Sequence, residues 1–208
     1  LPSAVQSEIQ VTNLIDLKMS HPDYFPLLVA NSILGGDFGS YINMNLREEH
    51  GYTYGAFSTF KTDKWTKGSF SIKTKVGNAV TAPAISEILK EVKRIQTTIV
   101  SEEKLAQAKA QYLGQFILAT ERPQTIANYA INIKVCNLPA DFYKNYIANI
   151  EAVTKEDVLR VANRYYTLYN FRIIVVGKAS EIKADLKKLT QRGQAIPLYE
   201  YDKYANKL

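Results

Sequence analysis

The chain has 208 residues, 46% of them hydrophobic, and carries a formal net charge of +6. This length and apolar content can bury the core of one large or two small domains, and no shift in composition marks a boundary. The longest apolar runs are far shorter than the roughly 20 residues of a membrane-spanning helix, so we expect a soluble chain without a transmembrane segment. Basic and acidic residues are interleaved, which favours solvated helix faces and argues against a nucleic-acid-binding surface.

The single cysteine, Cys136, excludes an internal disulfide and any multi-cysteine metal site on this chain. It lies in a helical pattern, where we expect a small buried apolar residue. The opening residues lack an initiator methionine and the basic start and apolar centre of a signal peptide, which suggests a processed or excised segment. Neither feature selects a compartment, so bacterial cytoplasm and periplasm both stay open.

The first predicted element is a half-buried strand over residues 8–19, where apolar and polar side chains alternate. After two prolines, a helix is predicted over about 27–34. Gly35 and Gly36 are expected to end it in the left-handed conformation that glycine tolerates. A second helix is predicted over about 39–49.

Gly51 is expected to stop this second helix. Aromatic and β-branched residues then predict strands over 52–60 and 65–76, and the break between them is short enough for a hairpin. In the later strand, apolar residues alternate with a polar set that comprises Ser69, Ser71, Lys73 and Lys75. An antiparallel pair of strands is therefore predicted directly after the second helix.

A block of helices follows the hairpin. The predicted helices cover 79–97, a segment capped by Ser101, 123–135, 139–150 and 154–166. In the last of them Thr154 is the expected N-cap, and Asp157 three residues later forms a looser relative of the capping box. The sequence thus places most of its helical content in one continuous stretch.

Residues 171–177 form a near-continuous apolar run, which predicts a strand buried on both faces. A short helix over 182–189 and a polar tail complete the chain. Strands, then helices, then one returning strand indicate an α+β fold, in which an antiparallel-rich sheet packs against a layer of several helices. We expect one domain over 1–190, followed by a C-terminal extension over 191–208.

Several kinds of catalytic centre lack their residues. The two histidines, His21 and His50, lie far apart in the sequence and belong to neither HExxH nor HxxEH, so no zinc site is expected on this chain. His50 is expected to face solvent near a helix C-terminus. No serine occupies a GxSxG elbow, and the glycines after the first helix match no phosphate-binding loop.

Arg47 and Tyr54 are the remaining candidates. An arginine at the end of a helix and a tyrosine at the start of the following strand can face one cleft, as an anion-stabilising and substrate-holding site requires. Taken alone, however, such an arginine more often stabilises a helix dipole, and such a tyrosine more often packs. Spacing leaves both interpretations open.

The stretch NSILGGDFGSYINMNLREEHGYTYGAFSTF resembles the second domain found in each half of insulinase-like (pitrilysin) zinc metallopeptidases, which include the mitochondrial processing peptidases. The positions that match the family pattern in order are Leu34, Gly35, Gly36, Ser40, Leu46, Arg47, Glu48, Gly51 and Tyr54. Where the family usually has an arginine after the serine, this chain has Tyr41. The resemblance extends in layout over most of the chain.

The resemblance implies that HxxEH and a downstream glutamate hold zinc on another domain, and that this chain binds no cofactor itself. Arg47 and Tyr54 would then hold the substrate carbonyl and stabilise the oxyanion as catalytic and substrate-binding residues. Gly35 and Gly36 are further candidate substrate-binding residues, because glycine allows close backbone approach. The implied partners are a peptide or unfolded polypeptide and a zinc-binding half in the same protein or a partner subunit.

Two alternatives remain at this point. The chain can be a catalytically inactive structural or assembly domain of the same family, or a generic peptide-binding module unrelated to proteolysis. The resemblance also implies that peptides bind in extended form against a sheet edge, and the sequence does not identify that edge.

Overall fold

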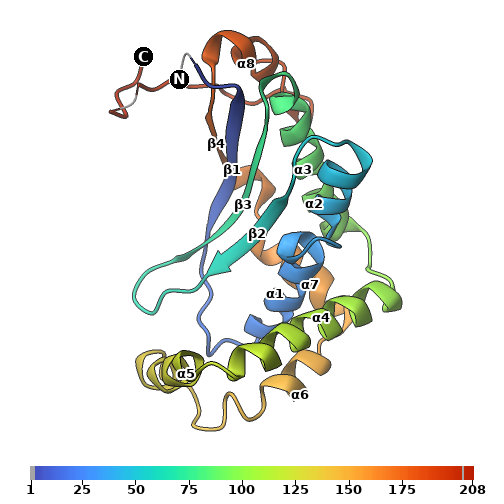
Figure 1. The fold of residues 1–208 in the computed structure, drawn as a ribbon, viewed down its shortest axis with the longest axis vertical. Helices are drawn as coiled ribbons and strands as arrows, with labels where there is room; N and C mark the ends of the chain where they lie inside the picture. The colour runs from blue at the N-terminus through green and yellow to red at the C-terminus, as the bar shows by residue number, and fades with distance from the viewer. Residues whose placement is uncertain (1–2, 203) are drawn as a thin grey trace.

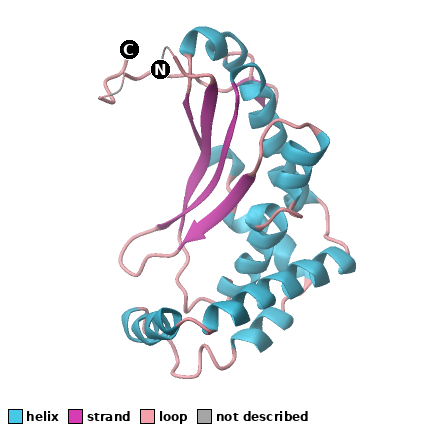
Figure 2. Cartoon of the chain, viewed as in Figure 1, coloured by secondary structure: helices cyan, strands magenta, loops and turns pink. Residues whose placement is uncertain are grey.

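The computed structural model describes residues 3–202 and 204–208 (Figure 1). Its main sheet has four strands in the order β2-β3-β1-β4, and every neighbouring pair is antiparallel. The helices gather on one side of these strands (Figure 2). The predicted α+β fold class, an antiparallel sheet against a layer of helices, is therefore confirmed.

The strands of this sheet are β1 (Gln6–Ile15), β2 (Ala56–Lys61), β3 (Gly68–Gly77) and β4 (Arg172–Val176). The helices are α1 (Tyr24–Asn31), α2 (Tyr41–Asn43), α3 (Thr81–Thr97), α4 (Glu102–Thr120), α5 (Pro123–Val135), α6 (Tyr146–Glu151), α7 (Lys155–Tyr165) and α8 (Ala179–Leu186). Single π turns extend α1 over Ser32–Gly36 and α2 over Met44–Glu49. No helix in the described part of the chain is long and apolar enough to span a membrane.

The buried face of the sheet follows directly from strand alternation. Along β1, every second residue is buried, namely Ser7, Ile9, Val11, Asn13 and Ile15, and the residues between them are half-buried or exposed. Helix α3 lies against β1 and β3, and α7 packs on both α3 and α1. Helices α4, α5 and α6 lie below the sheet in Figure 1. One face of the sheet is thus built into the core.

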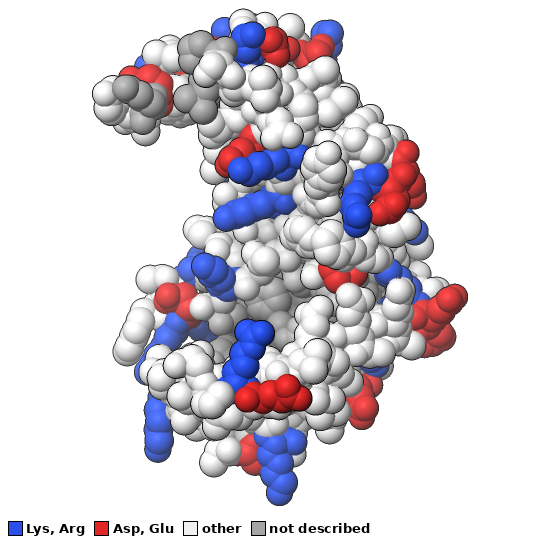
Figure 3. All heavy atoms as spheres, viewed as in Figure 1, with Lys and Arg blue, Asp and Glu red and all other residues white. Residues whose placement is uncertain are grey.

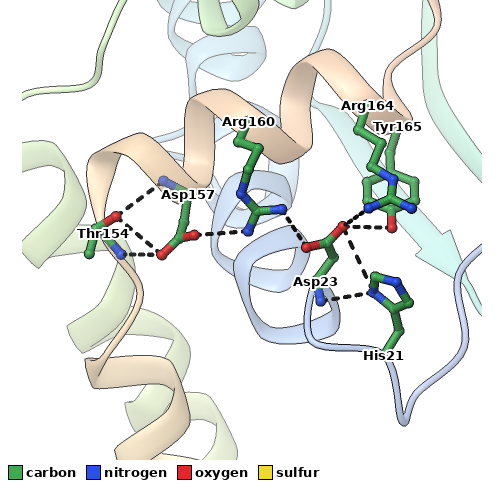
Figure 4. A network of polar contacts seen from close by, with 7 residues as sticks. All are labelled: His21, Asp23, Thr154, Asp157, Arg160, Arg164 and Tyr165. Atoms are coloured by element: carbon green, nitrogen blue, oxygen red, sulfur yellow. Dashed lines mark hydrogen bonds and ion pairs between the residues drawn. The ribbon is translucent and has the colours of Figure 1, made fainter.

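A polar network ties the start of α1 to α7 (Figure 4). The buried Asp23 carboxylate accepts hydrogen bonds from Arg160 at 2.5 Å, Arg164 at 2.9 Å and the Tyr165 hydroxyl at 2.9 Å. His21 accepts one from the Asp23 backbone N–H at 3.0 Å. Burial alone would raise the pKa of Asp23, but the hydrogen bonds from Arg160 and Tyr165 outweigh it and lower the pKa below the ordinary value.

Aromatic rings join α1 to the helices below the sheet. Phe116 of α4 stacks on Tyr146 of α6 with ring centroids 4.3 Å apart, and Tyr129 of α5 stacks on Tyr143 at 3.8 Å. The hydroxyls of Tyr112 and Tyr146 are 2.9 Å apart. No residue of α5 is fully buried, and this helix joins the stacked rings through Tyr129.

Local signals predicted several elements correctly. Helices α3, α4, α5 and α7 form where periodicity and caps indicated them, with Ser101 accepting a hydrogen bond from the Lys104 N–H at 3.1 Å. Thr154 and Asp157 form a full capping box. Gly51 ends the π turn of α2 with a φ of +64°, as expected. Cys136 lies just after α5 and is partly buried against the core.

Gly35 and Gly36 do not end α1 in the left-handed conformation, so that prediction was wrong. Gly35 has φ −162° and ψ 20°, an extended φ open to any residue. Its backbone instead approaches β2 closely: a Cβ on Gly35 would lie 2.7 Å from the N and Oγ atoms of Ser58. The glycine is explained by contact between α1 and the sheet.

Strand β4 is not buried on both faces, in contrast to the prediction from its apolar run. It forms an edge of the sheet and pairs only with β1. Ile174 and Val176 are 50% and 48% exposed, because the face of the sheet on which they lie has no helix over it. An apolar run specifies neither a strand's position in the sheet nor what covers it.

Several element boundaries also differ from the predictions, including that of β1, which ends at Ile15 instead of residue 19. Strand β2 begins at Ala56 because Thr53 forms a local turn, with its Oγ1 bonded to both the N–H and the carbonyl of Gly55. The segment 139–145 forms turns instead of a helix, so α6 is short. After α8, a small hairpin of β5 (Thr190–Gln191) and β6 (Gln194–Ala195) crosses the predicted boundary between the domain and its C-terminal extension.

Candidate functional site

Arg47 lies in the last turn of the π segment that extends α2. Its guanidinium carbon is 4.9 Å above the ring centroid of Phe38, and its Nη1 is 3.5 Å from a carboxylate oxygen of Glu48. The side chain is 41% exposed. This cation is thus oriented by an aromatic ring and one neighbouring acid, while part of its donor fork faces solvent.

Tyr54 lies in the loop between Gly51 and β2, not at the start of the strand. It is 92% exposed, the highest value among the large exposed hydrophobic residues of the described chain. Its side chain borders a groove of about 620 Å³ on the uncovered face of the sheet. The groove is lined by Gln6, Glu8, Ile9, Gln10, Thr53, Tyr54, Gly55, Phe57, Lys73, Thr74, Lys75, Ile174 and Val176.

Two phenylalanines connect the Arg47 region to this groove. The Phe38 ring, on which Arg47 lies, meets the Phe57 ring edge-to-face with centroids 5.3 Å apart. Phe57 projects from β2 into the groove beside Tyr54. No direct contact joins Arg47 to Tyr54 among the described residues, so the structure places them on one continuous aromatic surface without pairing them.

The two candidate substrate-binding glycines, Gly35 and Gly36, lie outside the groove. Gly35 is buried against Ser58, and Gly36 is exposed with Asn31 behind it. Neither belongs to the residues that line the groove. Close helix–strand packing accounts for Gly35, and a substrate contact at either glycine stays a prediction.

The residues that the structure describes do not fit a catalytic zinc ion. The described residues contain no group of three or more histidine, cysteine, aspartate or glutamate side chains that could hold a metal ion. His21 accepts a hydrogen bond from the Asp23 backbone, and His50 stacks on Tyr52 with its Nε2 atom 3.8 Å from Glu87. Burial would raise the pKa of Glu87, but hydrogen bonds from Lys90 and Asn45 lower it, so protein donors hold this carboxylate.

Sequence reasoning missed most of the groove. Lys73 and Lys75 were recognised as the polar side of a strand, yet nothing local indicated that their face would stay uncovered. Ile174 and Val176 were assigned to the core. The alternation in β3 is a local signal that could have indicated the lysines of the groove. The position of β4 could not be predicted, because it depends on pairing with a strand more than 150 residues earlier.

Residues 4–112 match the family model described as the peptidase M16 inactive domain. This chain belongs to the peptidase M16 inactive-domain family. The match contains the whole segment from Gly35 to Tyr54 together with β1, β2, β3 and α3. The resemblance to the non-zinc-binding domain of insulinase-like peptidases is therefore confirmed.

Individual relatives agree with this family. The chain is 23% identical over 159 residues to the "Probable inactive metalloprotease YmfF" of Bacillus subtilis strain 168, covering 76% of this chain and 36% of the relative. A crystal structure of a peptidase M16 inactive domain from Pseudomonas fluorescens superimposes with a TM-score of 0.77 at 22% identity, covering 84% of this chain and 41% of the other. The chain thus spans well under half the length of both relatives.

A shorter structure matches over nearly its full length. The inactive peptidase domain of a putative zinc protease from Bordetella parapertussis has a TM-score of 0.70 at 14% identity, and the match covers 84% of this chain and 93% of that one. At 14% identity, this similarity shows only that the two chains share a fold. A domain of this size was therefore crystallised as a separate chain.

Proposed function

We propose that this M16 inactive domain is the non-catalytic structural half of a zinc peptidase assembly, which pairs with a zinc-binding half and forms part of the wall against which a polypeptide lies. Family membership supports the non-catalytic assignment, and so does the lack of a fitting zinc ligand set in the described residues. The relatives' greater length leaves room for a zinc-binding half in the same protein, and a separate subunit is the other possible source.

The observation that carries the wall proposal is the uncovered face of the sheet. Ile174 and Val176 are about half exposed at one edge of the groove, and Tyr54 and Phe57 form an aromatic border at the other. Large apolar side chains that stay exposed together on one face are typical of surfaces that contact another polypeptide. The polar groups between the two borders can hydrogen-bond an extended chain.

A second candidate function gives Arg47 and Tyr54 a catalytic contribution. It is favoured by the extreme exposure of Tyr54 and by the aromatic surface that connects Arg47 to the groove. Each side chain has donors free to bind a carbonyl oxygen that a partner half positions. On this hypothesis both residues face the partner's active centre in the assembly.

One experiment tests the assembly and then separates the two functions. The chain is mixed with the HxxEH-bearing half from the same source, and association is followed by sedimentation velocity with peptidase activity measured in parallel. We expect a complex, and peptidase activity that needs both halves. Failure to associate, or full activity of the zinc-binding half alone, would overturn the structural proposal.

Substitutions in the assembled enzyme then test the second candidate. Arg47→Ala and Tyr54→Phe should leave kcat nearly unchanged if the domain is structural, whereas loss of an oxyanion donor lowers kcat by about 10² to 10³. The matched controls Arg122→Ala and Tyr201→Phe change exposed residues outside the groove lining. A large loss confined to the first pair would establish the catalytic contribution.

A further inference from the structure

The uncovered face of the sheet carries an excess of positive charge. The register places Phe57, Lys73, Gln10 and Ile174 in one row across the four strands, and Lys75, Glu8 and Val176 in the next. Thr12 pairs with Arg172 one row further along, and Lys61 pairs with Ser69 beyond that. Glu8 is the one acidic residue that the strands place on this face.

Three of these cations have no acidic partner among the described residues. Lys75 binds Glu8 with 2.7 Å between Nζ and Oε1, whereas Lys61, Lys73 and Arg172 are exposed and form no ion pair. These three cations thus lie on one face of the sheet without a neutralising acid.

Part of this charge lies in the groove that the apolar residues border, because Lys73 and Lys75 both belong to its lining. Figure 3 shows basic side chains on both sides of the hollow in the middle of the molecule. Lys73 lies in the groove lining between Phe57 and Ile174. Cations placed on low-dielectric apolar walls attract anions more strongly than isolated surface lysines do. The face therefore combines apolar contact with an attraction for negative charge.

We propose that this face binds an extended polypeptide segment that carries acidic and apolar side chains on the same side of its backbone. The inference rests on the proposed function and adds the class of polypeptide. Same-side residues of an extended chain are two positions apart and about 7 Å apart, which matches the spacing of Lys73 and Lys75 along β3. One carboxylate can then reach Lys73, while apolar neighbours contact Phe57 or Ile174.

The same geometry disfavours basic segments. A lysine or arginine side chain laid on this face would meet Lys73, Lys61 or Arg172 at short range without an acidic partner, because Glu8 is already bound to Lys75. Like charges in contact lower affinity and shift selection toward the oppositely charged ligand. The face should therefore distinguish polypeptides by charge as well as by apolar content.

Binding of three labelled peptides to the full chain tests this proposal by fluorescence anisotropy. The first peptide has glutamate and leucine alternating on one side of an extended backbone, and its twins carry glutamine or lysine in place of glutamate. We expect the acidic peptide to bind at least about fivefold more tightly than the glutamine twin and the lysine twin to bind most weakly, with added salt reducing the difference. Equal affinity for the acidic and glutamine peptides, or no binding of the acidic peptide, would overturn the proposal.

Variants locate the binding. Lys73→Gln and Arg172→Gln should each weaken binding of the acidic peptide about two- to fivefold and leave the affinity for the glutamine twin unchanged. Lys93→Gln, on the exposed side of α3, is the matched control and should change neither. If Lys93→Gln had the same effect as Lys73→Gln, the attraction would come from net charge and the site would be rejected.

These outcomes are separate from those of the proposed function. Peptide binding that does not depend on charge would overturn the inference about acidic segments and would leave the proposed association with a zinc-binding half unaffected. Conversely, charge-selective binding without such association would remove the assembly proposal and keep the acidic preference.

Discussion

The side-chain amide of Asn43 hydrogen-bonds both backbone polar groups of Ala56. Its Oδ1 accepts from the Ala56 N–H at 2.9 Å, and its Nδ2 donates to the Ala56 carbonyl at 2.6 Å. Asn31 similarly donates to the Ser58 carbonyl at 3.2 Å. Since β2 forms one border of the sheet, these two asparagines occupy groups that another strand would otherwise bind, and they protect this edge.

Replacement of Asn43 should therefore be costly. Asn43 is fully buried, and Asn43→Ala leaves two buried backbone groups of Ala56 without partners. We expect the free energy of unfolding to fall by about 2 to 4 kcal/mol, measured by urea denaturation. The matched control Asn128→Ala, on the exposed surface of α5, should change it by less than about 0.5 kcal/mol. Similar losses in both variants would argue against the edge role.

Two glycine substitutions should act in opposite directions. Gly35→Ala places a Cβ within 2.7 Å of backbone and side-chain atoms of Ser58 and should destabilise the chain by about 1 to 3 kcal/mol through overpacking. Gly114→Ala, in the middle of α4 with nothing within 4 Å, should stabilise it by about 0.5 to 1 kcal/mol. Thermal and urea unfolding of both variants decide the point, and a neutral Gly35→Ala would contradict the close packing.

The Asp23 network predicts a pH-dependent stability. Because the folded-state pKa of Asp23 is lowered, its contribution is fully present above the unfolded value of about 3.9 and is lost as the pH falls through the folded value. Asp23→Asn should cost about 1 to 3 kcal/mol at pH 7, and the gap to the unmodified chain should narrow below about pH 4.

Unfolding curves at several pH values measure this gap. Asp141→Asn, an exposed aspartate that accepts a hydrogen bond only from Asn145, is the control and should cost less than about 0.5 kcal/mol. If the difference in unfolding free energy between Asp23→Asn and the unmodified chain stayed constant between pH 7 and pH 3, the charge of Asp23 would not be the source of its stabilising contribution.

The capping box of α7 gives a local prediction. Thr154 Oγ1 accepts from the Asp157 N–H at 3.1 Å, and Asp157 accepts from the Thr154 N–H at 3.2 Å. Thr154→Ala should destabilise the chain by about 1 kcal/mol. Thr97→Ala, where the hydroxyl bonds a carbonyl within the last turn of α3, should be nearly neutral. Equal unfolding midpoints for the two variants would contradict the capping role.

Helices α3, α4 and α7 and the family motif follow from the sequence by itself. The apolar repeat of α3, the Ser101 cap of α4 and the Thr154 cap of α7 are local signals, since each joins residues within a few positions along the chain. Gly51 is also a local signal, because it ends the helical segment through its own positive φ. The ordered motif around Arg47 and Tyr54 needed no structure to indicate the family.

The groove was decided only by the tertiary structure. Phe57, Lys73, Glu8 and Ile174 come from four strands, and their meeting depends on long-range register and on which face the helices cover. Strand pairing leaves Ile174 half exposed, although its apolar run is typical of a buried strand. The close approach of Gly35 to Ser58 is likewise a tertiary contact, between the end of α1 and β2. Periodicity records which side of an element a residue occupies, but what lies on that side is determined by segments far away in the chain.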